Sequence, residues 1–236
     1  MPATRCWMLD GGILDPTMHV KITYYVDVIS SWCFWTEPTW AELRQRFSKI
    51  MEFIWKIAQM TADALPKSRE QCDWFYRRSG TIVRSLAKLN SGWFELDPPP
   101  CIAPNAIAEA ARDFGVTDDR VRHALARAAL RDGRKVGRWE ESAAVAAPIV
   151  GKDASTLIAK ARSPEIAARI KASTDEFFGF KVNQRPAFLI ENDIGDRAVF
   201  SGLIAAPPLG ATIEAMWHDA TAYEAYAVHH GPPPES

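Results

Sequence analysis

A serine and a cysteine stand three positions apart in the segment Ser30-Ser31-Trp32-Cys33. This segment follows an apolar run over residues 19–28 and precedes a helical pattern, so it lies where a helix begins. Free backbone N–H groups and the helix dipole at such a point stabilise a thiolate. The Ser30 hydroxyl is a weak nucleophile without a base, but it donates well to a bound thiolate. The spacing therefore indicates either a site that holds an external thiolate or a plain helix cap.

Cys33 is expected one helical turn further on, flanked by Trp32 and Trp35. A buried thiol is usually inert, and serine at position 30 leaves Cys33 without a local partner for a disulfide. Two interpretations stay open: a packing residue, or a thiol that forms a mixed disulfide. The chain holds nine tryptophans, and this excess favours a bulky apolar pocket around the motif. Trp32, Trp35, Trp40, Trp55 and Trp74 are expected in the core or in a pocket wall, with Trp55 and Trp74 in segments that adjoin the same cleft.

The elements that position the motif follow the order strand, helix, strand. Residues 19–28 are rich in β-branched and aromatic side chains and read as a buried strand. A helix is expected to open at Trp35-Thr36-Glu37-Pro38, capped by Thr36 or a nearby serine. In residues 51–57, large apolar side chains stand at every second position, which predicts a second strand. This order favours a parallel βαβ unit.

The middle of the chain, residues 62–174, is mostly helical and rich in alanine and arginine. Strand patterns return at residues 186–191 and 197–200, separated by a turn, and predict a β-hairpin. A last helix is expected from about Pro208 to Ala227. Residues 19–61 and 175–228 are therefore expected to form one discontinuous α/β domain. Residues 62–174 are expected to form an all-helical insertion, and residues 1–18 and 229–236 are expected to be loose termini.

Composition narrows the classes of function. A net charge of −1 and a pI of about 6.5 argue against nucleic acid as the main partner, and the basic stretch 120–138 reads as a solvated helix face. No stretch approaches ~18 consecutive apolar residues, so no membrane partner is expected. The histidines are isolated, so no metal is expected. The four cysteines lack the paired spacing of a disulfide framework or a zinc site: Cys6, Cys33, Cys72 and Cys101. The N-terminus also lacks the apolar segment of a signal peptide, so we expect the protein in the reducing cytoplasm.

The element order, with residues 30–33 at the first strand–helix junction, resembles the DsbA-like branch of the thioredoxin superfamily. Asp27 before the motif fits that family's D-x-x-(C/S)-x-x-C arrangement, and Arg185-Pro186 matches its cis-proline strand. The resemblance covers residues 19–226. It implies a thioredoxin-like fold, a βαβ–ββα mixed sheet with an inserted helical domain, and a possible homodimer.

Serine at position 30 is similar to the motif of 2-hydroxychromene-2-carboxylate isomerases and kappa-class glutathione transferases, and Pro104-Asn105-Ala106 resembles their proline–asparagine segment. Cys33 departs from their usual small residue, and the Asp-Arg pair after their last strand is absent. The resemblance implies glutathione as co-substrate, bound by Ser31, Trp32 and the backbone before Pro186.

A cis X–Pro bond would turn the backbone of Arg185 toward the site, where an extended peptide could pair with it as an added strand. The Arg185 guanidinium would bind a substrate carboxylate or else form a surface ion pair. Ser201 and Gly202 follow the last strand and are expected, by the same resemblance, to bind the γ-glutamyl carboxylate.

Three hypotheses follow. The first is a glutathione-dependent isomerase or transferase acting on a small aromatic or electrophilic substrate, with Ser30 stabilising the glutathione thiolate. The second is a monothiol disulfide oxidoreductase that uses Cys33. The third is a redox-inactive thioredoxin-fold module that binds a ligand without catalysis.

Overall fold

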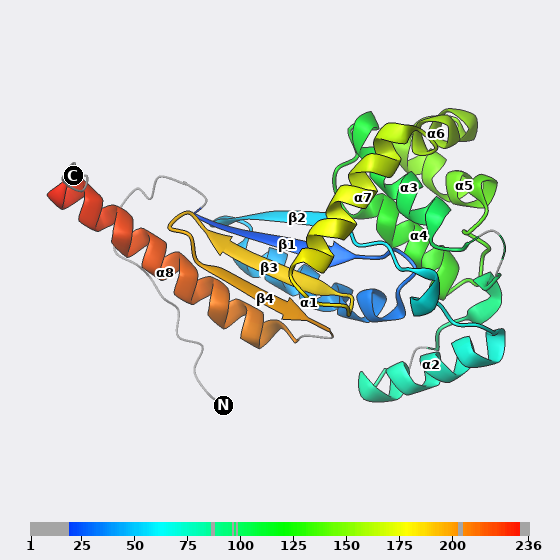
Figure 1. Cartoon of the computed structure of the whole chain (residues 1–236), viewed down its shortest axis with the longest axis horizontal. Coiled ribbons are helices and arrows are strands. Elements are labelled where there is room, and N and C mark those ends of the chain that lie inside the picture. Colours follow the sequence, from blue (N-terminus) through cyan, green and yellow to red (C-terminus); the bar gives the residue numbers. More distant parts are fainter. Residues whose placement is uncertain (1–18, 86–87, 96, 98, 203–204, 232–236) are drawn as a thin grey trace.

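A four-stranded mixed sheet lies at the centre of the computed structural model, which describes residues 19–85, 88–95, 97, 99–202 and 205–231 (Figure 1). The strand order is β2-β1-β3-β4. β1 and β2 are parallel, while β3 is antiparallel to both β1 and β4, which confirms the predicted βαβ–ββα order. The strands are β1 (Val20–Val26), β2 (Met51–Ile57), β3 (Ala187–Asn192) and β4 (Arg197–Ser201).

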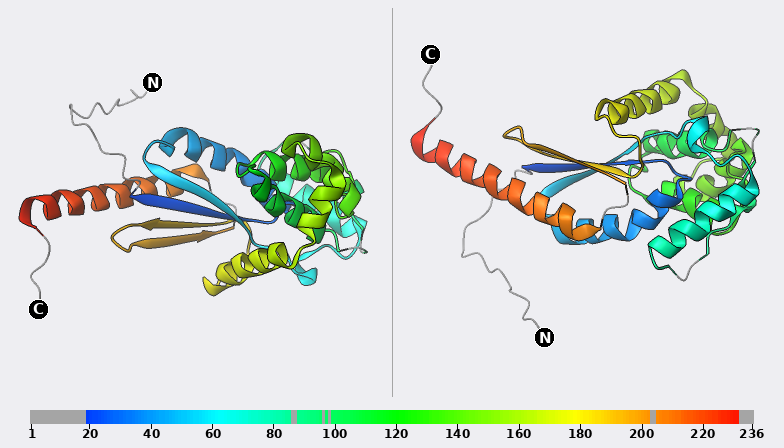
Figure 2. Two further views of the ribbon diagram at one scale, coloured as in Figure 1. Left: turned by 90° about the horizontal axis from the view of Figure 1, so that it is seen from above. Right: turned by 60° about the horizontal axis from the view of Figure 1, so that its bottom comes forward.

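Helices cover both faces of the sheet (Figures 1 and 2). α1 (Ser31–Phe47) and α8 (Ala206–His230) lie on one face, and α7 (Pro164–Gly179) lies on the other. Successive side chains of a strand point to opposite faces, so Tyr24 joins the core under α1 while Tyr25 joins the core under α7. Because both faces are buried, β1 reads as a continuous apolar run.

The inserted helices form a group at one end of the sheet, between β2 and β3 along the chain (Figure 1). α3 lies at the centre of this group and packs against α4, α5, α6 and α7. α7 continues without a break through the predicted boundary at residues 174 and 175. The other inserted helices are α2 (Arg69–Ile82), α3 (Ile102–Ala110), α4 (Arg120–Leu130), α5 (Trp139–Val150) and α6 (Ala154–Ala161).

α1 begins four residues earlier than the sequence suggested. Ser30 is its N-cap, and the Ser30 hydroxyl accepts a hydrogen bond from the backbone N–H of Cys33 at 3.4 Å. Pro38 therefore lies inside the helix rather than in its first turn. Its missing N–H removes one hydrogen bond from the helix, yet Trp40, Leu43 and Phe47 still point into the core as predicted.

Other helix ends also differ from the prediction. α3 begins two residues before Pro104, and α2 passes through Gly80 without a break. α8 includes His229 and His230, which were expected in a loose tail. Residues 1–18, which include Cys6, lie outside the described residues. None of the helices in the described part of the chain combines the length and the apolar character needed to span a membrane.

Candidate active site

Ser30 lies at the N-terminus of α1, as predicted, with a side chain that is 6% exposed. Its backbone N–H donates to the carbonyl of Asp27 at 3.1 Å, which closes the turn between β1 and α1. Ser31 and Trp32 form the first turn of α1 and are half-buried. The hydroxyl of Ser30 is thus placed beside the free N–H groups of a helix end, where negative charge is stabilised.

The turn is held by a fully buried pair, Asp27 and Asn105. The Asp27 carboxylate accepts hydrogen bonds from the backbone N–H groups of Ile29 at 3.0 Å and Met60 at 2.7 Å, and from Asn105 Nδ2 at 2.8 Å. Asn105 Oδ1 in turn accepts from the N–H of Val28 at 3.0 Å. Burial raises the pKa of Asp27, and the hydrogen bonds from Met60 and Asn105 offset only part of this effect.

Cys33 is buried, with 2% of its surface exposed. Burial raises the pKa of its thiol to about 12, although its hydrogen bond with Ser30 acts in the opposite direction. The thiol is therefore protonated at neutral pH, and a protonated thiol is a poor nucleophile. Of the two interpretations left open for Cys33, this environment favours the packing residue.

A pocket of about 170 Å³ opens beside Ser30. Ser31 and Trp32 line it, together with Trp93, whose indole N–H donates to the Tyr76 hydroxyl at 2.7 Å. Trp93 stands in a short 3-10 turn of the insertion, where no periodic pattern marked it as part of the site.

Neither Trp55 nor Trp74 lines this pocket, although their segments were expected to adjoin it. Trp55 is buried in the core under the guanidinium of Arg112, with 3.7 Å between the Arg112 Cζ atom and the indole ring centroid. Trp74 is 51% exposed and lies under Arg78 instead.

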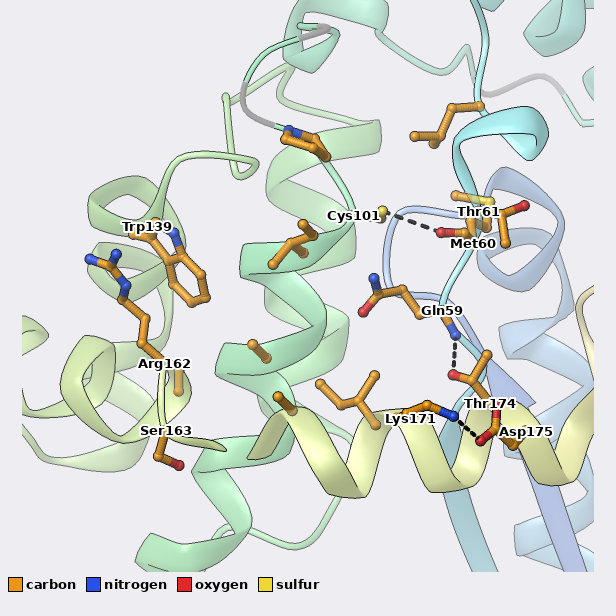
Figure 3. Close-up of a pocket in the computed structure, with 17 residues that line it drawn as sticks. Gln59, Met60, Thr61, Cys101, Trp139, Arg162, Ser163, Lys171, Thr174 and Asp175 are labelled. Atoms are coloured by element: carbon orange, nitrogen blue, oxygen red, sulfur yellow. Dashed lines mark hydrogen bonds and ion pairs between the residues drawn. The ribbon is translucent and has the colours of Figure 1, made fainter. Parts of the chain in front are cut away.

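A second, larger cavity of about 740 Å³ adjoins this pocket, and Met60 and Leu65 line both (Figure 3). Its walls come from α3, α7 and the residues that follow β2, with the Trp139 ring on one side and Gln59 opposite it. The Cys101 thiol donates to the Met60 carbonyl across its upper edge at 3.5 Å. The lining is mainly apolar, which suits the apolar body of a small molecule.

The Arg185–Pro186 peptide bond is cis. The expected surface ion pair of Arg185 is wrong: its side chain is 8% exposed and is turned toward the end of β2. Its guanidinium donates to the carbonyls of Ala58 and Gln59, in the latter case over 2.7 Å from Nη2. Burial lowers the pKa of Arg185, and the neighbouring Asp27 and Cys33 act against this lowering. Two of its donors are thus already used within the protein.

Ser201 and Gly202 lie beside the Arg185–Pro186 segment rather than in the pocket beside Ser30. The Ser201 hydroxyl donates to the Gln184 carbonyl at 3.0 Å, and the N–H of Gly202 donates to the Pro186 carbonyl at 2.8 Å. In this arrangement they hold the cis-proline segment in place. Their binding of a carboxylate stays a prediction.

One buried ion-pair cluster was not predicted from the sequence. Arg122, expected on a solvated helix face, is buried and pairs with Glu37 on α1 and with Asp119 at 2.7 Å. Glu37 also accepts from the Tyr24 hydroxyl at 3.2 Å and pairs with His123. The alternating charges around Arg122 carried no signal that this one residue turns inward. The described residues hold no group of three or more side chains suited to ligating a metal.

Proteins of known structure share this architecture. No family model matches the chain, and neither does any curated protein. Solved structures do match. One from Nitrosomonas europaea, provisionally described as a protein disulfide isomerase, shares 16% identity and a TM-score of 0.64, covering 90% of this chain and 99% of that one.

Two further solved structures are similar to the chain in fold. The cytosolic disulfide reductase DsbM from Pseudomonas aeruginosa gives 15% identity and a TM-score of 0.61 over 89% of this chain and 98% of that one. A thioredoxin-like oxidoreductase from Silicibacter pomeroyi gives 16% identity and a TM-score of 0.52 over 83% of this chain and 85% of that one. The chain therefore has a DsbA-like thioredoxin fold with a helical insertion. At these identities the likeness defines the fold and not the activity.

Proposed function

We propose that the protein is a thiol-dependent enzyme that binds glutathione and acts as an isomerase or transferase on a small aromatic or electrophilic substrate. The observation that carries the proposal is Ser30, whose hydroxyl caps α1 beside an open pocket while the thiol of Cys33 is buried. A hydroxyl at this place supplies a hydrogen bond to an external thiolate but no sulfur of its own.

The chemistry that this arrangement suits is nucleophilic addition. A lone pair of the glutathione sulfur forms a bond to an electrophilic carbon, and the displaced π electrons move onto the conjugated carbonyl oxygen of the substrate, which takes a proton from water. A transferase releases this adduct. An isomerase lets the adduct rotate about the former double bond, which is now single. The enol oxygen then returns its proton to water as the thiolate leaves, which restores the carbonyl, the double bond and glutathione.

The two cavities divide the ligand between them in this proposal. The cysteinyl part of glutathione occupies the pocket of about 170 Å³ beside Ser30, and its backbone pairs with the extended segment before Pro186. The substrate occupies the apolar cavity of about 740 Å³ on the other side of Met60 and Leu65. We also propose the cytoplasm as the location, and a homodimer as the assembly.

A second candidate is a thiol–disulfide oxidoreductase that uses Cys33. It is favoured by the similar solved structures, which are described as a disulfide reductase and a thioredoxin-like oxidoreductase. The burial of Cys33 and its raised pKa argue against it.

The deciding experiment is a calorimetric titration of the full chain with glutathione, with the thiol pKa of the bound ligand followed by ultraviolet thiolate absorbance. We expect Ser30→Ala to weaken binding about fivefold or more and to raise that pKa, since one charge-assisted hydrogen bond is lost. Ser48→Ala, at the exposed opposite end of α1, is the matched control and should change neither quantity much.

Absence of binding at millimolar glutathione would refute the proposal. Reduction of glutathione mixed disulfides that is lost in Cys33→Ser would establish the second candidate instead. Binding that persists with no turnover affected by Ser30→Ala or Cys33→Ala would indicate the non-enzymatic binding module.

A further inference from the structure

A groove of about 620 Å³ between α1 and α4 takes no part in the function proposed above. Its α1 wall is aromatic and apolar, formed by Phe34, Trp35 and Pro38. Its other wall carries Arg127, in the last turn of α4, and Arg131, the C-cap of that helix. Residues four apart lie on one face of a helix. The groove thus joins a flat apolar wall to a row of positive charge.

No described residue neutralises this positive charge with an ion pair. Glu37, the one carboxylate among the described residues that line the groove, is already engaged: it pairs with Arg122 and His123 and accepts a hydrogen bond from the Tyr24 hydroxyl. Arg127 and Arg131 form no ion pair and no side-chain hydrogen bond with any described residue. Two guanidinium groups therefore remain available to a ligand.

The two arginines stand at the end of α4, where a cation gains from the helix dipole. That effect is weak at an exposed position, and it does not account for the aromatic wall opposite. Trp35 is fixed there, because its indole N–H donates to the Ser79 hydroxyl on α2 at 3.2 Å. Phe34 meets it edge to face, with 5.6 Å between the ring centroids.

The direction of the helices places the groove near the start of α1. Asp119 at the beginning of α4 pairs with Arg44, and Arg122 pairs with Glu37 further back along α1. The two helices thus run antiparallel, so Arg127 and Arg131 lie toward the end of α1 that carries Ser30.

We propose that this groove binds an aromatic phosphate. The ring lies against Trp35 and Phe34, and the phosphate lies between Arg127 and Arg131. Two guanidinium forks match the charge and the several acceptor oxygens of a phosphate dianion, and their planar groups can bind it bidentately. The site is distinct from the pocket beside Ser30, so it does not depend on glutathione binding.

The test uses three probes titrated into the full chain without glutathione: 1-naphthyl phosphate, 1-naphthol and inorganic phosphate. The proposal expects naphthyl phosphate to bind at least about tenfold more tightly than either fragment, since ring and phosphate each contribute. Equal affinity for inorganic phosphate and naphthyl phosphate would show that the ring adds nothing to binding, and it would overturn the proposal.

Two pairs of variants locate the site. Arg127→Gln with Arg131→Gln should weaken naphthyl phosphate binding about tenfold or more, whereas Arg77→Gln with Arg120→Gln, which removes the same charge from exposed positions outside the groove, should not. Ala41→Trp should fill the groove and abolish binding, while Gln45→Trp, one helical turn further along α1 and outside the groove, should leave it intact. Binding that the arginine pair and Ala41→Trp leave unchanged would refute the assignment.

Discussion

The side-chain amide of Asn105 donates to Asp27 Oδ2 at 2.8 Å while its carbonyl oxygen accepts from the N–H of Val28 at 3.0 Å. Asn105 belongs to α3 of the insertion, and Asp27 and Val28 belong to the turn between β1 and α1. The conformation of the turn that presents Ser30 is therefore fixed from outside the thioredoxin-like domain.

Replacing Asn105 by alanine should lower the free energy of unfolding by about 2–4 kcal/mol, because it leaves a buried N–H and part of a buried carboxylate without a partner. Urea unfolding measures this loss. The Asn105 hydrogen bond lowers the pKa of Asp27, so the loss should shrink at acid pH, where the carboxyl is protonated in both states. Ile102→Ala on the same helix, where the side chain is 40% exposed, is the control and should cost much less.

Cys33 should make the protein less stable in alkali. Its folded pKa of about 12 lies above the ~8.5 of a free thiol, so the unfolded chain ionises first as the pH rises. The contribution is complete below ~8.5 and is lost toward pH 12. Relative to its value at pH 7, the stability of the wild type should therefore fall by about 2 kcal/mol more than that of Cys33→Ala when both are measured near pH 10. Equal falls would show that the pKa of the thiol is the same in the folded and the unfolded chain, which would contradict the prediction.

Arg122→Met should cost about 3–5 kcal/mol, since it leaves the buried Glu37 without its main partner. Adding Glu37→Gln should restore part of that loss, which a double-mutant cycle by chemical unfolding quantifies. Arg120→Gln, in an exposed pair with Asp118, is the comparison and should change stability by less than about 1 kcal/mol. Strictly additive effects of the two buried substitutions would contradict the pairing.

Glu37 should also affect how the stability of the protein changes at acid pH. Burial alone would raise the pKa of this carboxyl, but His123 and Arg122 together hold it below its usual value. Its contribution to stability is present above pH ~4.5 and is lost as the pH falls through the lower folded pKa. Unfolding of Glu37→Gln at several pH values should therefore show a shallower decline below pH ~4.5 than the wild type.

The strands and the motif could be predicted because their signals are local. The apolar run at residues 19–28 and the hairpin around residues 192–196 need no distant partner to be read, and a serine before a helical pattern marks a cap wherever it occurs. The positions of Trp74 and Arg122 have no such local signal. Whether a side chain on an amphipathic helix is exposed or buried depends on which helix packs against it, and for Arg122 that helix is α1, 85 residues away.

α7 reaches both parts of the site. Ala167 and Ile170 line the larger cavity, while Phe177, near the other end, lies under the Arg185 guanidinium, with 4.6 Å from the Arg185 Cζ atom to the ring centroid. A helix is stiff along its axis and advances about 1.5 Å per residue. A molecule that wedges against Ala167 would thus move α7 as a lever, and its far end would transmit the displacement to Arg185 and to β3, which begins two residues later.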